Sequence, residues 1–169
     1  MLIAGERVWF SAMVSIRQSL SGSLERVTVV CRDITERKNA EQAITLANRE
    51  WEQTFDAISD LIMIVNTDYK ILRANKAMAE GLGVTPQQAI GMTCYKAVHG
   101  ENAPSSSCPH SKLLADGKEH STEMEVERLG GAFLVSASPL HGEEGNLIGS
   151  VHVAHKMPDS KRAGEKGPS

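Results

Sequence analysis

Residues 51–76 read WEQTFDAISDLIMIVNTDYKILRANK, and this stretch decides the fold class. The apolar run over residues 61–66 predicts a strand, and the polar residues 67–69 predict a turn. Residues 70–74 then predict a second strand that returns antiparallel to the first. The stretch therefore indicates a strand pair at the beginning of a domain that we place at residues 59–155.

Turn and helix-end signals divide the rest of this domain into further elements. Asn75, Thr85 and Pro109 occupy positions typical of helix N-termini, and glycines close each expected helix. Residues 92–107, before the last of these helices, are expected to be irregular. Three strands are expected at the end of the domain, over residues 121–128, 133–140 and 147–155. A strand pair, short helices and a three-stranded meander together predict an α+β fold.

The sequence contains an internal repeat, because residues 10–40 align without a gap to residues 133–163. Each copy reads as an alternating strand, a glycine-containing turn, a second strand and a polar run. The identical pairs include Phe10 and Phe133, Gly22 and Gly145, and Leu24 and Leu147. Residues 1–32 are therefore expected to be the C-terminal hairpin of a truncated unit of the same kind.

Residues 33–58 predict a single linker helix. Asp33 is a good N-cap residue, and Glu36 follows three positions later, as in a capping box. Apolar side chains recur every seven residues along the helix, at Ile44, Trp51 and Ile58. Two interpretations fit this spacing: a seam between two copies of the chain, or an amphipathic face that packs on the following domain.

Charge and hydropathy argue against several classes of partner. The chain has a net charge of -3, and residues 51–155 are acidic, with 7 Lys and Arg against 13 Asp and Glu. An acidic domain is not expected to bind nucleic acid or an anionic membrane. No apolar run approaches the ~20 residues that cross a bilayer. Three cysteines are too few for a disulfide framework, so we expect a cytoplasmic protein, with a disordered tail over residues 156–169.

Two motifs resemble those of a known family. Residues 33–38, Asp-Ile-Thr-Glu-Arg-Lys, match the signature with which PAS domains pass from their last strand into a signalling helix. Residues 51–76 look like the opening of such a domain. The resemblance implies a five-stranded antiparallel sheet with short helices on one face, preceded here by the linker helix and a β-hairpin. It assigns a signalling role to Asp33, Ile34 and Thr35.

The resemblance also implies a sensory module whose pocket detects a small ligand or a redox state. The pocket candidates are the apolar residues Ile64, Leu113, Met124, Val126 and Val135. The internal alignment places Lys156, Met157 and Pro158 opposite residues 33–35, so no second signalling helix is expected. Output is expected through the linker helix or through a homodimer, with a signalling kinase or another output domain as partner.

Cysteine and histidine side chains concentrate in one part of the domain. The candidates are Cys94, His99, Cys108 and His110, whose sulfur and nitrogen atoms are ligands that zinc or a redox metal prefers. A loop could bring these four residues around a metal ion, or one of the two histidines could hold a non-covalent haem. Cys108 is alternatively a redox-sensing thiol, because it precedes a helix N-terminus. In the simplest interpretation, Cys94 packs as a small apolar residue and the histidines lie on the surface.

Catalytic motifs are not found in the sequence. A histidine kinase needs a phospho-accepting histidine on a long helix and an ATP site rich in Asn and Gly, and the chain shows neither. No glycine-rich phosphate loop or catalytic triad spacing occurs. We therefore predict a non-catalytic sensory module. Three alternatives stay open: a fragment of a sensor histidine kinase without its catalytic part, a metal- or haem-binding redox sensor, and an interaction scaffold without a ligand.

Overall fold

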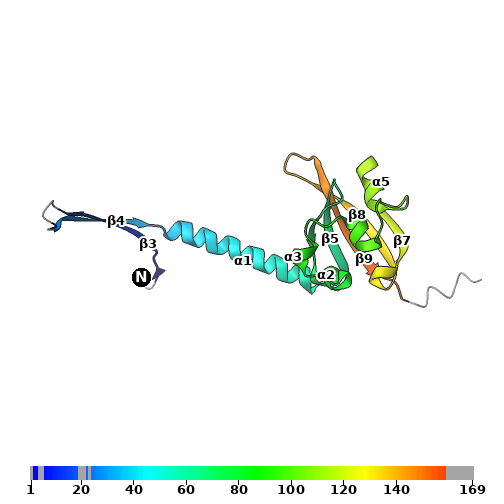
Figure 1. Cartoon of the computed structure of the whole chain (residues 1–169), viewed down its shortest axis with the longest axis horizontal. Coiled ribbons are helices and arrows are strands. Elements are labelled where there is room, and N and C mark those ends of the chain that lie inside the picture. Colours follow the sequence, from blue (N-terminus) through cyan, green and yellow to red (C-terminus); the bar gives the residue numbers. More distant parts are fainter. Residues whose placement is uncertain (1, 4–5, 19–21, 23, 159–169) are drawn as a thin grey trace, which may run out of the picture. The chain divides into compact units, whose positions relative to one another are not determined.

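The structure is a computed structural model that describes residues 2–3, 6–18, 22 and 24–158. Contacts between Cα atoms divide the chain into two compact units, residues 1–52 and residues 53–169 (Figure 1). Among these described residues, the first unit forms two two-stranded sheets and the second forms one five-stranded sheet.

The first unit is built on a long antiparallel hairpin. Strands β3 (Phe10–Gln18) and β4 (Leu24–Asp33) pair with each other, after a short pair formed by β1 (Leu2–Ile3) and β2 (Glu6–Arg7). Residues directly opposite in an antiparallel pair share a face, so one face carries Phe10, Ala12, Val14, Ile16, Val27, Val29 and Cys31. We call this surface the apolar face of the hairpin. All of its side chains are exposed in the part of the chain that the structure describes.

Helix α1 (Thr35–Ala57) begins directly after β4. The Asp33 carboxylate accepts hydrogen bonds from the Thr35 backbone N–H at 2.9 Å and from the Thr35 hydroxyl at 2.6 Å. These two bonds lower the pKa of Asp33. The sequence predicted Asp33 as the N-cap itself, whereas it caps the helix from two residues before the first helical residue.

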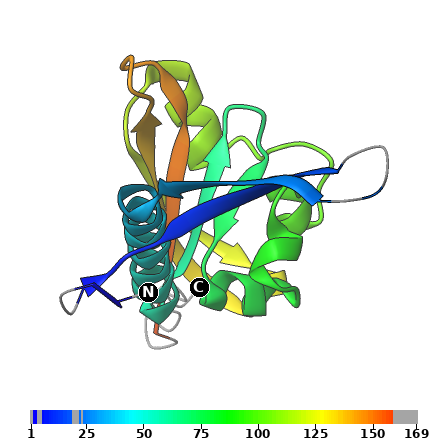
Figure 2. The ribbon, with the colours of Figure 1, turned by 90° about the vertical axis from the view of Figure 1, so that its left-hand side faces the viewer.

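The second unit is a five-stranded antiparallel sheet with short helices on one face (Figure 2). Its strands are β5 (Leu61–Asn66), β6 (Ile71–Ala74), β7 (His120–Val126), β8 (Gly131–His141) and β9 (Leu147–Lys156). The spatial order is β6-β5-β9-β8-β7, so the last strand of the sequence lies at the centre of the sheet. The predicted α+β fold class is confirmed.

Local signals set the ends of the helices on this sheet. The helices are α2 (Lys76–Leu82), α3 (Pro86–Ala89), α4 (Cys94–His99) and α5 (Pro109–Asp116), and a 3-10 turn covers Glu127–Leu129. Thr85 and Gln88 form a reciprocal capping box at the start of α3. Gly83, Gly100 and Gly117 end their helices with a positive φ, which glycine adopts without steric cost.

Two expectations about this unit were wrong. The stretch expected to be irregular contains helix α4, which is only six residues long and therefore shows no helical periodicity in the sequence. The strand expected over residues 121–128 ends at Val126, because residues 127–129 turn into a 3-10 helix. Gly100 was the available signal for the end of α4.

The internal repeat corresponds to two hairpins with the same register. Phe10 pairs with Asp33 in β3–β4, and the residues aligned with them in the repeat, Phe133 and Lys156, pair with each other in β8–β9. The register shift in each hairpin also falls at equivalent places, between Arg17 and Gln18 and between Leu140 and His141. The repeat found in the sequence is therefore a repeat of backbone geometry.

The buried side chain of Asn75 joins β5, α2 and the segment that follows α1. Its Oδ1 accepts hydrogen bonds from the backbone N–H groups of Ile62 at 3.0 Å and Met78 at 2.9 Å, which lie in β5 and α2. Its Nδ2 donates to the carbonyls of Ile58 at 3.1 Å and Asp60 at 2.9 Å. A single amide therefore fixes where the chain leaves α1, enters β5 and starts α2.

Candidate functional site

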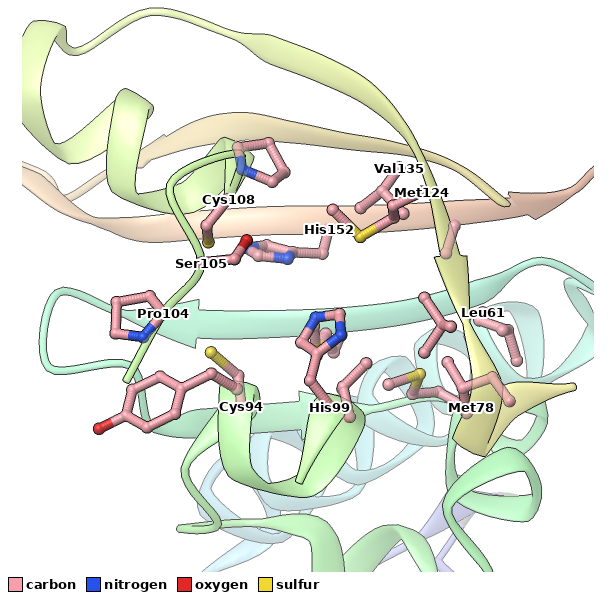
Figure 3. A pocket seen from close by; sticks show the side chains of 17 residues that line it. Leu61, Met78, Cys94, His99, Pro104, Ser105, Cys108, Met124, Val135 and His152 are labelled. Atoms are coloured by element: carbon pink, nitrogen blue, oxygen red, sulfur yellow. The ribbon is translucent and has the colours of Figure 1, made fainter. Parts of the chain in front are cut away.

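A cavity of about 40 Å³ lies between the sheet and the helices of the second unit (Figure 3). Side chains from β5, β7, β8 and β9 line it on the sheet side, and α2, α4 and the residues before α5 line the other side. Sulfur and hydroxyl groups of Cys94, Ser105 and Cys108 gather at one end. Leu61, Met78 and Met124 form an apolar opposite end. The cavity is thus apolar over most of its wall and polar at one end.

A buried chain of hydrogen bonds adjoins this cavity. His110 Nδ1 lies 2.7 Å from Ser150 Oγ, and His152 Nε2 lies 2.9 Å from the same hydroxyl. The second ring nitrogen of His110, Nε2, lies 3.1 Å from the Asn66 carbonyl oxygen. The side chains of His110, Ser150 and His152 are all buried. We call His110, Ser150 and His152 the imidazole–serine network.

The backbone explains why these residues meet. Ser150 and His152 are two positions apart on β9, so they point to the same face of the sheet. Pro109 starts α5 and places His110 in its first turn, above that face. Gly149 allows β9 to lie close to β5, because a Cβ at this position would collide with the Val65 carbonyl oxygen. A side chain at position 149 would therefore push the network away from β5.

Tyr69 supports the network from the β5–β6 turn. It has a φ of 62°, a left-handed conformation that is uncommon for a residue other than glycine. Its ring packs edge-on against His110 with 4.9 Å between centroids, and its hydroxyl lies 3.1 Å from Ser111 Oγ. The tyrosine therefore holds the start of α5 and the His110 ring in place.

Burial keeps the ionisable groups of the site neutral. Burial, with a smaller contribution from the neighbouring His110, lowers the pKa of His152 to about 3. The pKa of His110 is also lowered by burial, and the same cause lowers the pKa of His99. Burial raises the pKa of the Cys94 thiol to about 12. Near pH 7 the imidazoles of His110 and His152 and the thiol of Cys94 are therefore uncharged and present oriented dipoles.

Three of the five predicted pocket residues line the cavity, namely Met124, Val126 and Val135. Leu113 is fully buried on α5 but is not among the lining residues. Ile64 lies between Met63 and Val65 on β5, whose side chains are buried, so it points to the opposite face of the sheet. Ile64 was predicted to line the pocket, whereas its side chain lies on the face of β5 that points away from the cavity.

The candidate metal ligands do not act as one group. Cys94, His99 and Cys108 line the cavity, whereas both ring nitrogens of His110 are occupied by Ser150 and Asn66. In the part of the chain that the structure describes, no three His, Cys, Asp or Glu side chains come close enough to hold a metal ion. Cys108 is the half-buried N-cap residue of α5.

The predicted signalling and seam residues lie in or around α1. Ile34 N–H donates to the Trp9 carbonyl at 2.9 Å, and Thr35 Oγ1 accepts from Trp9 N–H at 3.0 Å, so the start of the helix is tied to the residue that precedes β3. The seam residues Ile44, Trp51 and Ile58 are 63%, 45% and 41% exposed. None of the residues of α1 is buried.

Sequence reasoning missed Ser150 and His152, because His152 was counted among surface histidines. A usable signal was present: the two polar residues share a face of β9 with the apolar residues Ile148 and Ala154. Two buried polar residues on one strand face need partners, and His110 was the candidate.

Comparison with known proteins identifies the class. A model of the PAS fold family matches residues 55–162, and the chain belongs to this family. Domains of this family are generally sensory rather than catalytic, and they occur in signalling proteins. In the described residues, no helix is both long and apolar enough to cross a bilayer.

Individual relatives agree with this assignment. The chain is 28% identical over 149 residues to the probable diguanylate cyclase DgcE of Escherichia coli. The matched region covers 83% of this chain but only 13% of the length of that protein. A PAS domain from Colwellia psychrerythraea has a TM-score of 0.52 at 18% identity, covering 66% of this chain and 97% of that one. A sensory box sensor histidine kinase from Vibrio cholerae has a TM-score of 0.52 at 15% identity, with 70% and 98% covered. These two structures support the fold.

The neutral state of His152 predicts a loss of stability in acid. Below its ordinary pKa of 6.5, the unfolded chain binds a proton that the folded chain does not bind until about pH 3. The free energy of unfolding should therefore fall by about 2 kcal/mol between pH 8 and pH 5 from this residue alone. His110 acts in the same direction. Urea unfolding at several pH values measures the fall.

Two variants test the assignment of this effect. In His152→Gln the fall between pH 8 and pH 5 should be smaller by about 2 kcal/mol. His141→Gln, in an exposed position, should show the same fall as the parent chain. An unchanged fall in His152→Gln would contradict the assignment.

Proposed function

We propose that residues 59–155 are a non-catalytic sensory PAS domain that detects a small molecule in the cavity described above. The observation that carries this proposal is a largely apolar cavity with oriented polar groups at one end, which is the usual design of a small-molecule site. The imidazoles are neutral and hydrogen-bonded, which suits recognition. The family's general role in sensing supports the same conclusion.

The output of the domain is proposed to lie in another domain or protein. The relative DgcE is a probable diguanylate cyclase, and one structural neighbour is a sensor histidine kinase. Because the chain spans 13% of the cyclase relative, an output domain of either kind fits the proposal. All three cysteines are free thiols, which supports a reducing compartment such as the cytoplasm.

Filling the cavity tests the proposed ligand binding. Ala154 lines the cavity, so Ala154→Phe should exclude a ligand at a stability cost of about 1–3 kcal/mol. Native mass spectrometry and a thermal-shift screen of small molecules should find ligands for the parent chain and for Ala115→Phe, an exposed control position. The same molecules should not stabilise Ala154→Phe. Failure of every screened molecule to stabilise the parent chain would contradict the proposal.

We also propose that the hairpin β3–β4 is the end of another PAS unit. Its register matches that of β8–β9, and its apolar face corresponds to the face of β8–β9 that lines the cavity. Val135 and Ala154 line the cavity, and their equivalents are Ala12 and Cys31. The apolar face would then be the core side of the other unit.

An exposed apolar sheet face favours association between chains. Val29→Glu places a charge on the apolar face of the hairpin and should raise the concentration at which the chain aggregates several-fold. Thr28→Glu adds the same charge on the opposite face and should have a smaller effect. Turbidity against concentration measures this difference. Equal effects of the two variants would argue against a core-side face.

Self-association through α1 is the remaining part of the proposal. Ile44 and Trp51 are exposed on α1, which has no buried residue, and Ile58 is exposed directly after its end. Such a line fits a seam between two helices. Trp51→Glu should lower the mass measured by light scattering, whereas Asn39→Glu, which lies off the seam, should not. A monomeric parent chain at high concentration would contradict this part.

A further inference from the structure

One ring nitrogen of His152 has no hydrogen-bond partner among the residues that the structure describes. Nε2 contacts Ser150 Oγ, but Nδ1 makes no hydrogen bond with any described residue. Every fully buried side-chain nitrogen and oxygen in the described residues has a partner, so Nδ1 must be reached from the cavity. The side chain is only 5% exposed and lines that cavity (Figure 3). A polar atom in this position is costly unless something binds it.

The imidazole–serine network determines whether Nδ1 donates or accepts. The Asn66 carbonyl can only accept, so His110 Nε2 carries a proton and donates to it. His110 is neutral, so its Nδ1 accepts the Ser150 hydroxyl proton. The Ser150 oxygen then accepts from His152 Nε2–H. Because His152 is also neutral, its Nδ1 is left as a hydrogen-bond acceptor.

The remaining wall of the cavity excludes a charged partner for this acceptor. None of the lining residues, all of which the structure describes, is Asp, Glu, Lys or Arg. An ion inside the cavity would lose its hydration without gaining an opposite charge. The ligand chemistry that fits is therefore uncharged.

The size of the cavity limits the ligand further. Its volume of about 40 Å³ is about three times the ~10–15 Å³ that a cavity needs, on a comparable measure, to hold one water molecule. Three methionines, Met63, Met78 and Met124, line the wall, and flexible thioether side chains can repack around a guest. A small ring can therefore enter with side-chain rearrangement, whereas a large cofactor cannot.

We infer that the cavity recognises a small uncharged cyclic molecule that donates an O–H or N–H hydrogen bond to Nδ1 of His152. This inference rests on the proposed function, because it names the ligand class of the same cavity. His152 acts as the specificity-determining residue, and Ser150 and His110 hold it in the accepting tautomer. The apolar end of the cavity takes the ring of the ligand.

Nitrogen NMR of the full chain tests the tautomer without any substitution. In uniformly ¹⁵N-labelled protein, long-range ¹H–¹⁵N spectra distinguish a protonated ring nitrogen from an unprotonated one. We expect an unprotonated Nδ1 and a protonated Nε2 in His152 at pH 7.5. Addition of phenol, the chosen probe, should shift the Nδ1 resonance in the direction of hydrogen bonding, whereas benzene should not. A protonated Nδ1 would overturn the inference.

Binding measurements on matched variants give a second test. His152→Phe keeps a ring but removes the acceptor, so the ratio of phenol affinity to benzene affinity should fall about tenfold, the value of one hydrogen bond. His99→Phe removes the other imidazole that lines the cavity and should leave the ratio unchanged. A ratio that is unchanged in His152→Phe would overturn the inference. If His152→Phe does not fold, the NMR result decides.

The two levels of the proposal fail differently. If neither phenol nor benzene perturbs the resonances of cavity residues in the parent chain, the cavity does not take small molecules, and both the proposed function and this inference fail. If both molecules bind and the Nδ1 resonance does not respond to phenol, the proposed function stands and the inference about His152 fails.

Discussion

The amide of Asn75 sets the geometry of the sensory unit. The end of α1, the start of β5 and the start of α2 all lie around the Asn75 side chain, and each transition leaves backbone groups without partners from regular structure. The Asn75 side chain satisfies groups from all three segments while it is itself fully buried. Loss of this amide would leave several buried donors and acceptors unpaired, at ~1–3 kcal/mol for each.

The position of β5 then determines what the cavity contains. Strand β9 pairs with β5 along its length, and Gly149 brings the two backbones together just before Ser150. The same pairing turns Ser150 and His152 towards α5, where His110 completes the hydrogen-bonded chain. An amide near one end of the sheet and a glycine near the other thus define the place of the polar groups between them.

Features that depend on neighbouring residues could be predicted from the sequence. The capping box at Thr85, the strand pair after residue 60 and the repeated hairpin all arise from short-range patterns. The pocket was predicted in part, since three of its five proposed residues line the cavity. Short elements were less visible: α4 has too few residues to display a period.

The polar part of the site could not be predicted because it is a long-range pairing. His110 and Ser150 are 40 positions apart, and nothing local in either segment specifies the other. His110 was singled out for metal binding, although its two nitrogens serve a serine hydroxyl and a backbone carbonyl. The residue type of His110 suggested a metal ligand. Its hydrogen bonds to Ser150 and the Asn66 carbonyl instead make it a structural support for His152.

The two hairpins have the same strand register although their side chains differ in chemistry. Both hairpins carry the same register shift next to the turn, although few of their inward-facing side chains agree. Positions 27 and 29 hold valines where positions 150 and 152 hold serine and histidine. The turn and the register shift beside it, rather than the inward-facing side chains, therefore determine how the two strands pair. Two positions on the inward face of such a hairpin can therefore change from apolar to hydrogen-bonding side chains while the register of its strands stays the same.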